Sequence, residues 1–185
     1  MRISHLLFCS AAALVLAAHP LMAQNWLVDQ KRSTVGIVGH KPTGPLSGSV
    51  EKWDGKIIFD PDHLDTSHVT VSIDTSSIKT NDTKWNSVLP GPDWLSSSAF
   101  PVATFESTSI TRTGGNAYAA DGSVTIRGIR HPVTLPFTVD LNGNTAHATG
   151  TLSLFRTDFN IGGLMENTPD FGITIGVTFD LTATK

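Results

Sequence analysis

Residues 173–182 read ITIGVTFDLT, and this stretch decides the fold class. Threonine, glycine or aspartate separates the apolar residues, which occupy every second position: Ile173, Ile175, Val177, Phe179 and Leu181. Successive side chains of a β-strand point to opposite faces, so a period of two is typical of a strand with one buried face. The C-terminal part of the chain is therefore predicted to form a half-buried strand.

Similar runs recur along the chain between Gly, Pro, Asn and Asp residues, which favour turns. The predicted strands are Trp26–Asp29, Thr34–Val38, Ser49–Trp53, Lys56–Phe59, Val69–Ile73, Val102–Ile110, Ala117–Ile126, Val133–Val139, Ala146–Phe155 and Ile173–Thr182. Turns are predicted at Asp54-Gly55, at Gly114-Gly115-Asn116 and at Asn142-Gly143. About eight to ten antiparallel strands follow from this pattern.

The composition favours β-structure along the whole chain. Thr, Val and Ile supply 48 of the 185 residues, and β-branched side chains pack better on a pleated sheet than on a helix. Hydrophobic residues make up 39% and charged residues 16%, and the formal net charge of −3 lacks the basic excess of nucleic-acid-binding proteins. We expect one all-β domain, no nucleic-acid partner, and neither a helical bundle, a coiled coil nor a multi-span membrane protein.

One segment has the period of a helix. In Thr80–Leu89, the apolar residues Trp85, Val88 and Leu89 stand at positions i, i+3 and i+4, and Pro90 follows. We expect one short helix here and a second helical turn through Asp93–Leu95. Antiparallel sheets of this size hide their edges by closing into a barrel or stacking as a sandwich, and a barrel of about eight strands encloses either packed side chains or one small ligand.

Residues 1–23 are predicted to be a secretory signal peptide. A positively charged start precedes a short apolar stretch, and the small residue Ala23 offers a cleavage site. The only cysteine is Cys9, so the mature chain 24–185 has no thiol for a disulfide, a nucleophile or a metal. No second long apolar run follows, so we expect a periplasmic protein without a membrane anchor.

Several ordered motifs resemble the YceI-like family of periplasmic, lipocalin-like proteins. They are FPVATFESTSI (100–110), GSVTIRGIRHPVTLP (122–136), Gly150, RTDFNIG (156–162) and the closing strand, with Trp26, Ser33, His40, Gly48 and Phe59-Asp60-Pro61 upstream. Asn160 stands where the family often has Gly, and Val88–Leu95 departs from the usual segment. If that segment covers the mouth of a tunnel, ligand choice here differs from that of the typical member.

The resemblance implies an extended antiparallel β-barrel over residues 24–185 that holds a lipid in an apolar lumen. The implied ligand is a polyisoprenoid, an isoprenoid quinone or a fatty-acid-type lipid, and the implied role is binding and transport, with no catalysis and no required cofactor. The resemblance leaves a homodimer open. Two other functions remain: a lipid-modifying enzyme on the same barrel, and a ligandless stress-response module that binds a protein partner.

Strand parity predicts which residues face the interior, and the resemblance suggests that they contact a ligand. The predicted ligand-binding residues are Val35, Ile37, Ile57, Phe59, Val71, Ile73, Phe105, Val124, Ile126, Leu135, Phe137, Leu154, Ile175 and Val177, joined by Trp85, Leu89 and Trp94 from the helical insert. The same alternation predicts that four further residues face the interior: Val133, Leu152, Ile173 and Phe179. The alternative is that these side chains fill a packed core.

Polar residues give weaker signals. Arg156 and Asp158 share the parity of Leu154, so they form an inward ion pair or meet a polar headgroup. The group Arg127, Arg130, His131 belongs to a rim that attracts an anion, or to a solvated turn. The acidic and histidine residues within 60–68 match no metal-binding spacing, and no Gly-x-Ser-x-Gly elbow is present.

Overall fold

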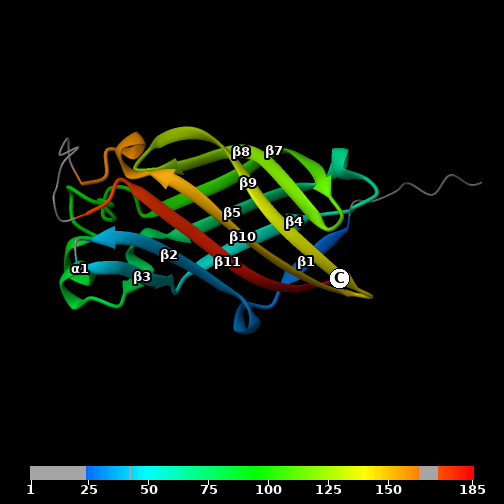
Figure 1. Cartoon of the computed structure of the whole chain (residues 1–185), viewed down its shortest axis with the longest axis horizontal. Helices are drawn as coiled ribbons and strands as arrows, with labels where there is room; N and C mark the ends of the chain where they lie inside the picture. Colours follow the sequence, from blue (N-terminus) through cyan, green and yellow to red (C-terminus); the bar gives the residue numbers. More distant parts are fainter. Residues whose placement is uncertain (1–23, 42, 163–170) are drawn as a thin grey trace, which may run out of the picture.

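The computed structural model describes residues 24–41, 43–162 and 171–185, and the predicted signal segment 1–23 lies outside them (Figure 1). The strands are β1 (Asn25–Val28), β2 (Thr34–Lys41), β3 (Gly44–Val50), β4 (Trp53–Ile58), β5 (His68–Asp74), β6 (Ile78–Thr80), β7 (Val102–Gly114), β8 (Ala117–Ile126), β9 (Ile129–Asn142), β10 (Thr145–Phe155) and β11 (Thr174–Thr184). The helices are α1 (Thr83–Val88) and the 3₁₀ turns η1 (Gln30–Arg32), η2 (Leu64–Thr66), η3 (Thr75–Ser77) and η4 (Arg156–Phe159).

The sheet closes on itself as an eight-stranded antiparallel barrel. Its strands follow the order β1-β4-β5-β7-β8-β9-β10-β11, and β11 returns to β1 through the pairs Leu27–Thr184 and Val28–Ala183. The remaining strands β2, β3 and β6 continue the sheet beside β11. This arrangement confirms the predicted all-β barrel and explains why more than eight strands are found in the chain.

Three of the eight barrel strands are each divided into two labelled segments by a short interruption. The segment β1 continues as β2, β3 continues as β4, and β5 continues as β6. Asp29 and Asp74 begin two of these interruptions, and each carboxylate accepts a hydrogen bond from the backbone N–H two residues later, at Lys31 (3.0 Å) and Ser76 (2.9 Å). Such local bonds compete with the ladder and favour turns over strand. They bend the strands without breaking the barrel.

Some predicted boundaries are wrong. Asp54-Gly55 lies inside β4 rather than in a turn, because Asp54 and Gly55 pair with Ser72 and Val71 of β5. The predicted strand Ser49–Trp53 is divided between the end of β3 and the start of β4. Asp93–Leu95 is a turn and not helical. The other two predicted turns, at residues 114–116 and 142–143, join β7 to β8 and β9 to β10.

Helix α1 is shorter than predicted. The Asp82 carboxylate caps its first turn by accepting a hydrogen bond from the Lys84 N–H (3.0 Å). Trp85 is its buried residue, and the helix ends shortly before Pro90, which cannot donate to the next helical turn. The helix and the turns that follow it connect β6 to β7.

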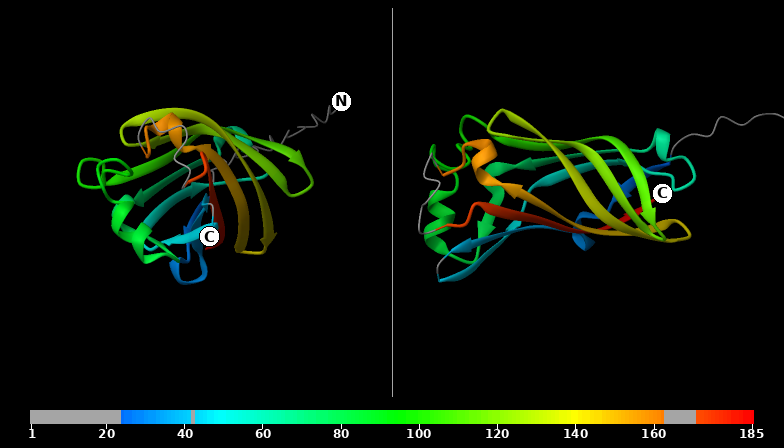
Figure 2. Two further views of the ribbon diagram at one scale, coloured as in Figure 1. Left: turned by 60° about the vertical axis from the view of Figure 1, so that its left-hand side comes forward. Right: turned by 45° about the horizontal axis from the view of Figure 1, so that its top comes forward.

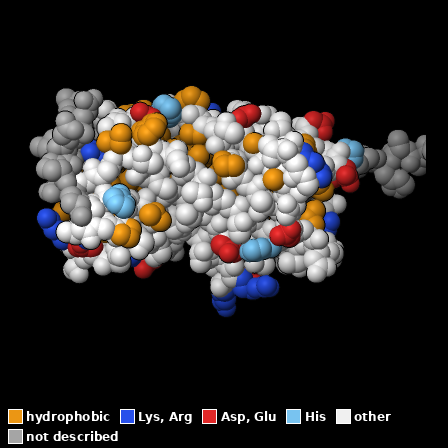
Figure 3. All heavy atoms as spheres, in the orientation of Figure 1, with side chains coloured by type: hydrophobic (Ala, Val, Ile, Leu, Met, Phe, Trp, Pro, Cys, Tyr) orange, Lys and Arg blue, Asp and Glu red, His pale blue; other side chains and the backbone are white. Residues whose placement is uncertain are grey.

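The barrel is longer than it is wide, and its two ends differ (Figures 1 and 2). Residues 81–100 lie at one end, here called the α1 end. The C-terminus lies near the opposite end, here called the C-terminal end. Figure 3 shows acidic and basic side chains interspersed on one face, with exposed hydrophobic atoms in small separate groups. In the part of the chain that the structure describes, no helix is both long and apolar enough to cross a membrane.

Candidate binding cavity inside the barrel

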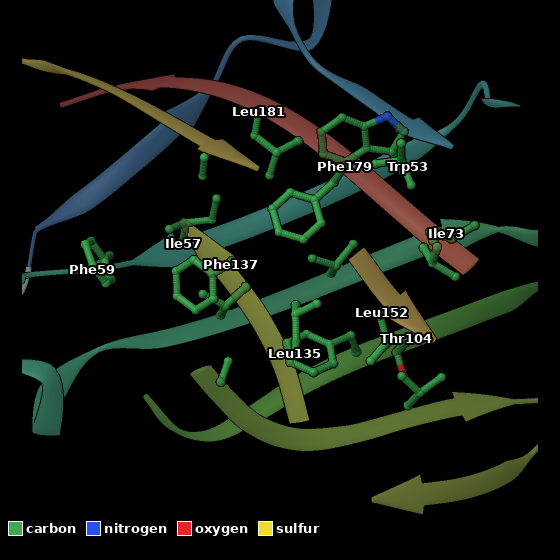
Figure 4. A pocket seen from close by; sticks show the side chains of 18 of the residues that line it. Trp53, Ile57, Phe59, Ile73, Thr104, Leu135, Phe137, Leu152, Phe179 and Leu181 are labelled. Atoms are coloured by element: carbon green, nitrogen blue, oxygen red, sulfur yellow. The ribbon is translucent and has the colours of Figure 1, made fainter. Parts of the chain in front are cut away.

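A cavity of about 180 Å³ occupies the barrel towards the C-terminal end (Figure 4). Its walls come from β1, β2, β4, β5 and β7–β11, because the alternate apolar side chains of these strands point into the barrel. Apart from the Thr104 hydroxyl and the indole N–H groups of Trp26 and Trp53, the lining side chains are hydrocarbon. The Trp26 indole donates to the Phe59 carbonyl oxygen (2.8 Å), so its polar atom is satisfied by the protein.

A second cavity of about 120 Å³ lies at the α1 end. Leu89, Trp94 and Leu95 contribute to its walls, so the segment that departs from the usual family pattern does cover this end of the interior. Its lining side chains with polar atoms are Thr75, Arg156 and the indole of Trp94. The Thr75 hydroxyl donates to the Phe100 carbonyl oxygen (2.9 Å) and is therefore satisfied.

The predicted interior residues line these two cavities, with one exception among the ligand-binding set. Those at the larger cavity are Val35, Ile57, Phe59, Val71, Ile73, Phe105, Val124, Ile126, Leu135, Phe137, Leu154 and Val177, and those at the smaller one include Ile37, Leu89, Trp94 and Ile175. Trp85 lines neither cavity. Leu152 and Phe179 line the larger cavity as parity predicts, whereas Val133 lines neither and Ile173 is 44% exposed, because it precedes the start of β11.

Trp85 instead supports the wall of the smaller cavity from behind. Its ring centroid lies 4.7 Å from that of Trp94 and 4.7 Å from that of Phe171, and Trp94 lies 5.4 Å from Phe171. Trp94 packs edge-to-face against both other rings, and Trp85 and Phe171 are tilted against each other. Aromatic contacts at these distances are favourable. The three rings form a cap at the α1 end, and only Trp94 and Phe171 present a surface to the cavity.

A second aromatic group packs near the C-terminal end. The Phe59 ring lies 5.1 Å from Tyr118 and 6.3 Å from Phe137, and Tyr118 stacks on Phe137 at 5.5 Å. The ammonium of Lys185 lies 5.2 Å from the Trp26 ring. Large aromatic groups are therefore packed near both ends of the interior.

Arg156 is the buried cation of the site, with only 1% of its surface exposed. Its Nη1 donates to the carbonyl oxygen of Ile161 (2.8 Å) and its Nε to that of Gly172 (3.2 Å). Asn160 makes the first contact possible, because its left-handed conformation (φ 53°) turns the chain back after η4. Burial lowers the pKa of the Arg156 guanidinium.

The predicted pairing of Arg156 with Asp158 is wrong. The Asp158 carboxylate lies 3.4 Å from the His131 imidazole, on the outer side of η4. The His131 ring also packs edge-on against Phe159, with ring centroids 5.9 Å apart. The strand alternation did not predict the direction of the Asp158 side chain, because β10 ends at Phe155 and the next residues form a 3₁₀ turn.

The basic residues at the β8–β9 turn have separate partners rather than one shared rim. Arg127 donates through Nη1 to the carbonyl oxygens of Pro92 (2.9 Å) and Trp94, which ties this turn to the segment covering the smaller cavity. Arg130 lies 3.7 Å from the Glu106 carboxylate in an exposed pair. Arg127 therefore ties its turn to the α1 end, and the three basic residues do not converge on one anion.

The acidic segment 60–68 has local structural roles. The Asp60 carboxylate accepts from the Asp62 N–H (3.0 Å), and among the described residues no three metal-type ligands come together. The Ser107 hydroxyl lies 3.3 Å from the His68 Nδ1, but it also accepts from the Val69 N–H (2.8 Å) at a bulge of β7. Neither Ser107 nor His68 lines a cavity.

Sequence reasoning missed the small and polar lining residues. Ala103, Ala120, Ala146, Ala148 and Ala183 line the larger cavity, and Thr104 joins them. Alanine contributes little to a hydrophobic alternation, so only its parity with a neighbour such as Phe105 could have revealed it. These small side chains matter because they leave space where a larger residue would fill the interior.

A closed antiparallel barrel with an apolar, incompletely filled interior is the class of protein defined by these observations. The pattern of the YceI-like domain family matches residues 26–183, which is nearly the whole described chain. The chain therefore belongs to the YceI-like family.

Known relatives agree with this assignment. A UPF0312 protein of Yersinia pestis is 32% identical over 167 residues, covering 84% of this chain and 85% of the relative. The crystal structure of Burkholderia cenocepacia BcnA has 34% sequence identity and a TM-score of 0.81, covering 85% of this chain and 99% of BcnA. A polyisoprenoid-binding domain from Saccharophagus degradans has the same fold at 14% identity, with a TM-score of 0.67 over 86% of this chain and 97% of that domain.

Proposed function

We propose that this protein binds a polyisoprenoid, an isoprenoid quinone or a related long-chain lipid inside the barrel and carries it through the periplasm. The observation that carries the proposal is the pair of adjoining apolar cavities along the barrel. Each methylene group removed from water contributes about 0.8 kcal/mol, so a dry channel binds a long chain without specific polar contacts. The polyisoprenoid-binding domain of the same fold supports the choice of ligand class.

The role we propose is binding rather than catalysis. General acid–base chemistry needs a titratable group positioned beside the reacting atoms, with a pKa suited to the working pH. Among the described residues that line the cavities, Arg156 alone has an ionisable side chain, and it is bonded to two backbone carbonyls. The hydrogen-bonded serine–histidine pair Ser107 and His68 lies outside both cavities.

One further support is independent of the cavity. The predicted signal peptide 1–23 would deliver the chain to the periplasm, where a lipid needs a protein to shelter it from water.

The experiment is a lipid analysis of the mature protein purified from a bacterial periplasm without detergent. Native mass spectrometry is expected to show a bound adduct, and an organic extract is expected to contain an isoprenoid lipid in a near-stoichiometric amount. A titration of the delipidated protein with a fluorescent fatty-acid probe, displaced by isoprenoid alcohols, gives affinities. A clean extract together with no displacement by any long-chain lipid would contradict the proposal.

A further inference from the structure

Five residues line both cavities, so their side chains form the boundary between the two spaces. They are Ile73, Ala103, Ile126, Leu154 and Val177, and we call this group the waist. Each comes from a different strand, in order β5, β7, β8, β10 and β11. The waist therefore surrounds the interior from most of the barrel wall.

Strand register places the waist at one level of the barrel. Ile73 is the direct partner of Ala103 across β5 and β7. The β7–β8 ladder pairs Thr104 with Thr125, so Ile126 lies beside Ala103 on the same inward face. On the opposite wall, Leu154 pairs with Ile175, and Val177 follows two residues later on the same face. A chain that passes from one cavity to the other must cross this level.

Ala103 is the one small side chain of the waist. The other four members are branched aliphatic residues, and Ile73 and Ile126 flank Ala103 on either side. Ile73, Ile126 and Val177 are β-branched and hold few rotamers in a strand, so they cannot swing aside freely. Residue 103 is therefore the position at which the waist contributes the least side-chain bulk to the boundary between the cavities.

We propose that the waist sets ligand selectivity by chain length, with Ala103 as the specificity-determining residue. This inference rests on the proposed function. A short isoprenoid chain occupies the larger cavity alone, whereas a longer isoprenoid chain passes Ala103 and enters the smaller cavity as well. The smaller cavity ends at Trp94 and Phe171, and these rings limit the longest chain that fits.

The proposal predicts that the affinity of the protein for an isoprenoid alcohol depends on the length of its chain. Each buried methylene strengthens binding about fourfold, which is the conversion of about 0.8 kcal/mol. In the wild-type protein, affinity is expected to rise from farnesol, with three isoprene units, to solanesol, with nine, because only solanesol enters both cavities. A side chain that closes the waist removes the gain in affinity of the longer chain and weakens binding of the shorter chain much less.

The test compares Ala103→Leu with Ala148→Leu. Ala148 lines the larger cavity and not the smaller one, so its substitution removes space without closing the waist. Ala103→Leu is expected to weaken solanesol binding at least tenfold more than farnesol binding, because Ala103 borders the larger cavity for both alcohols but only solanesol has to pass it. Ala148→Leu is expected to weaken both alcohols by similar factors. Affinities come from displacement of the fluorescent fatty-acid probe.

Equal losses for both alcohols in Ala103→Leu, or no loss for solanesol, would overturn the role of the waist. If the leucine variant does not fold, Ala103→Val gives the same comparison with a smaller side chain, and it is expected to weaken solanesol selectively. A wild-type protein that binds neither alcohol nor any other long-chain lipid would instead contradict the proposed function. The two failures are therefore distinguishable.

Discussion

The ring of Phe179 occupies the space that a side chain at Gly150 would fill. An ideal Cβ at Gly150 would lie 2.5 Å from the Phe179 Cζ and 2.7 Å from the Pro136 carbonyl oxygen. Gly150 and Phe179 are direct partners across β10 and β11, and Phe179 lines the larger cavity. The glycine lets the ring lie against the barrel wall instead of projecting across the interior.

Gly150→Ala is expected to destabilise the fold by about 1–3 kcal/mol, as overpacking of a core does. It is also expected to weaken lipid binding, because the displaced ring enters the cavity. Urea unfolding and the probe titration measure the two effects. Adding Phe179→Leu should recover part of both losses, although the contact with Pro136 remains. Unchanged stability and affinity in Gly150→Ala would show that the ring has space to move elsewhere.

Arg156 is predicted to hold together the turn after η4 and the start of the segment leading into β11. Arg156→Ala leaves the carbonyl oxygens of Ile161 and Gly172 without these donors, at a cost of about 1–3 kcal/mol for each buried acceptor. Arg156→Lys is expected to recover little of this, because one ammonium lacks the planar fork that reaches two separated acceptors. Urea midpoints measure the effect, with exposed Arg112→Ala as the control. A lysine variant as stable as wild type would contradict this account.

Substitutions of Trp94 and Trp85 distinguish a residue that lines the cavity from one that supports the cavity wall. Trp94→Ala removes cavity wall and is expected to weaken binding of a prenyl quinone about tenfold, or roughly 1.4 kcal/mol. Trp85→Ala removes a buried ring outside the cavity and is expected to cost about 3–5 kcal/mol of stability. At a temperature where both variants are folded, Trp85→Ala should bind more tightly than Trp94→Ala. The reverse order in a fluorescence titration would remove Trp94 from the site.

The contact between Lys41 and Asp82 makes the α1 end sensitive to acid. A hydrogen bond from the Lys41 ammonium (2.5 Å) is the main reason that the pKa of Asp82 lies below 3.8. A carboxylate with a lowered folded-state pKa stabilises the fold above its unfolded-state pKa, and this contribution is lost as the pH falls through the folded-state value.

Asp82→Asn keeps an oxygen for the cap of α1 but loses the charge. We expect it to lower the urea midpoint at neutral pH and to differ progressively less from wild type as the pH falls below about 4. Asp54→Asn, at an exposed position of β4, controls for the loss of one negative charge. A difference between Asp82→Asn and wild type that stays constant down to about pH 2 would exclude the charge as its cause.

The sequence predicted most of the strands because burial on one face imposes an alternation that can be read directly. Strand β8 occupies the predicted range, Ala117–Ile126. The turn predicted at Asp54-Gly55 is wrong because strand pairing overrode the local turn preference of these residues. Gly55 pairs with β5 in the ladder, and a Cβ on it would lie 3.7 Å from the Trp53 ring. The turn preference of two residues is weaker than the strand pairing and packing that the closed barrel imposes on them.

The site was predictable where it followed parity and unpredictable where it depended on the fold. Alternation placed Ile73, Ile126 and Val177 inward, but it cannot tell a filled barrel from a hollow one. That distinction depends on small residues such as Ala103, whose effect appears only when opposite walls are brought together. The partners of Arg156 were equally hidden, since the Gly172 carbonyl is sixteen residues away in the sequence.

A crystal structure of the mature protein grown with solanesol tests the central claim most directly. The account predicts continuous tubular density inside the barrel, running from the wall near Phe59 past Ala103 to Trp94. An interior in which the side chains close both cavities, with no density for the alcohol at saturating concentration, would contradict it.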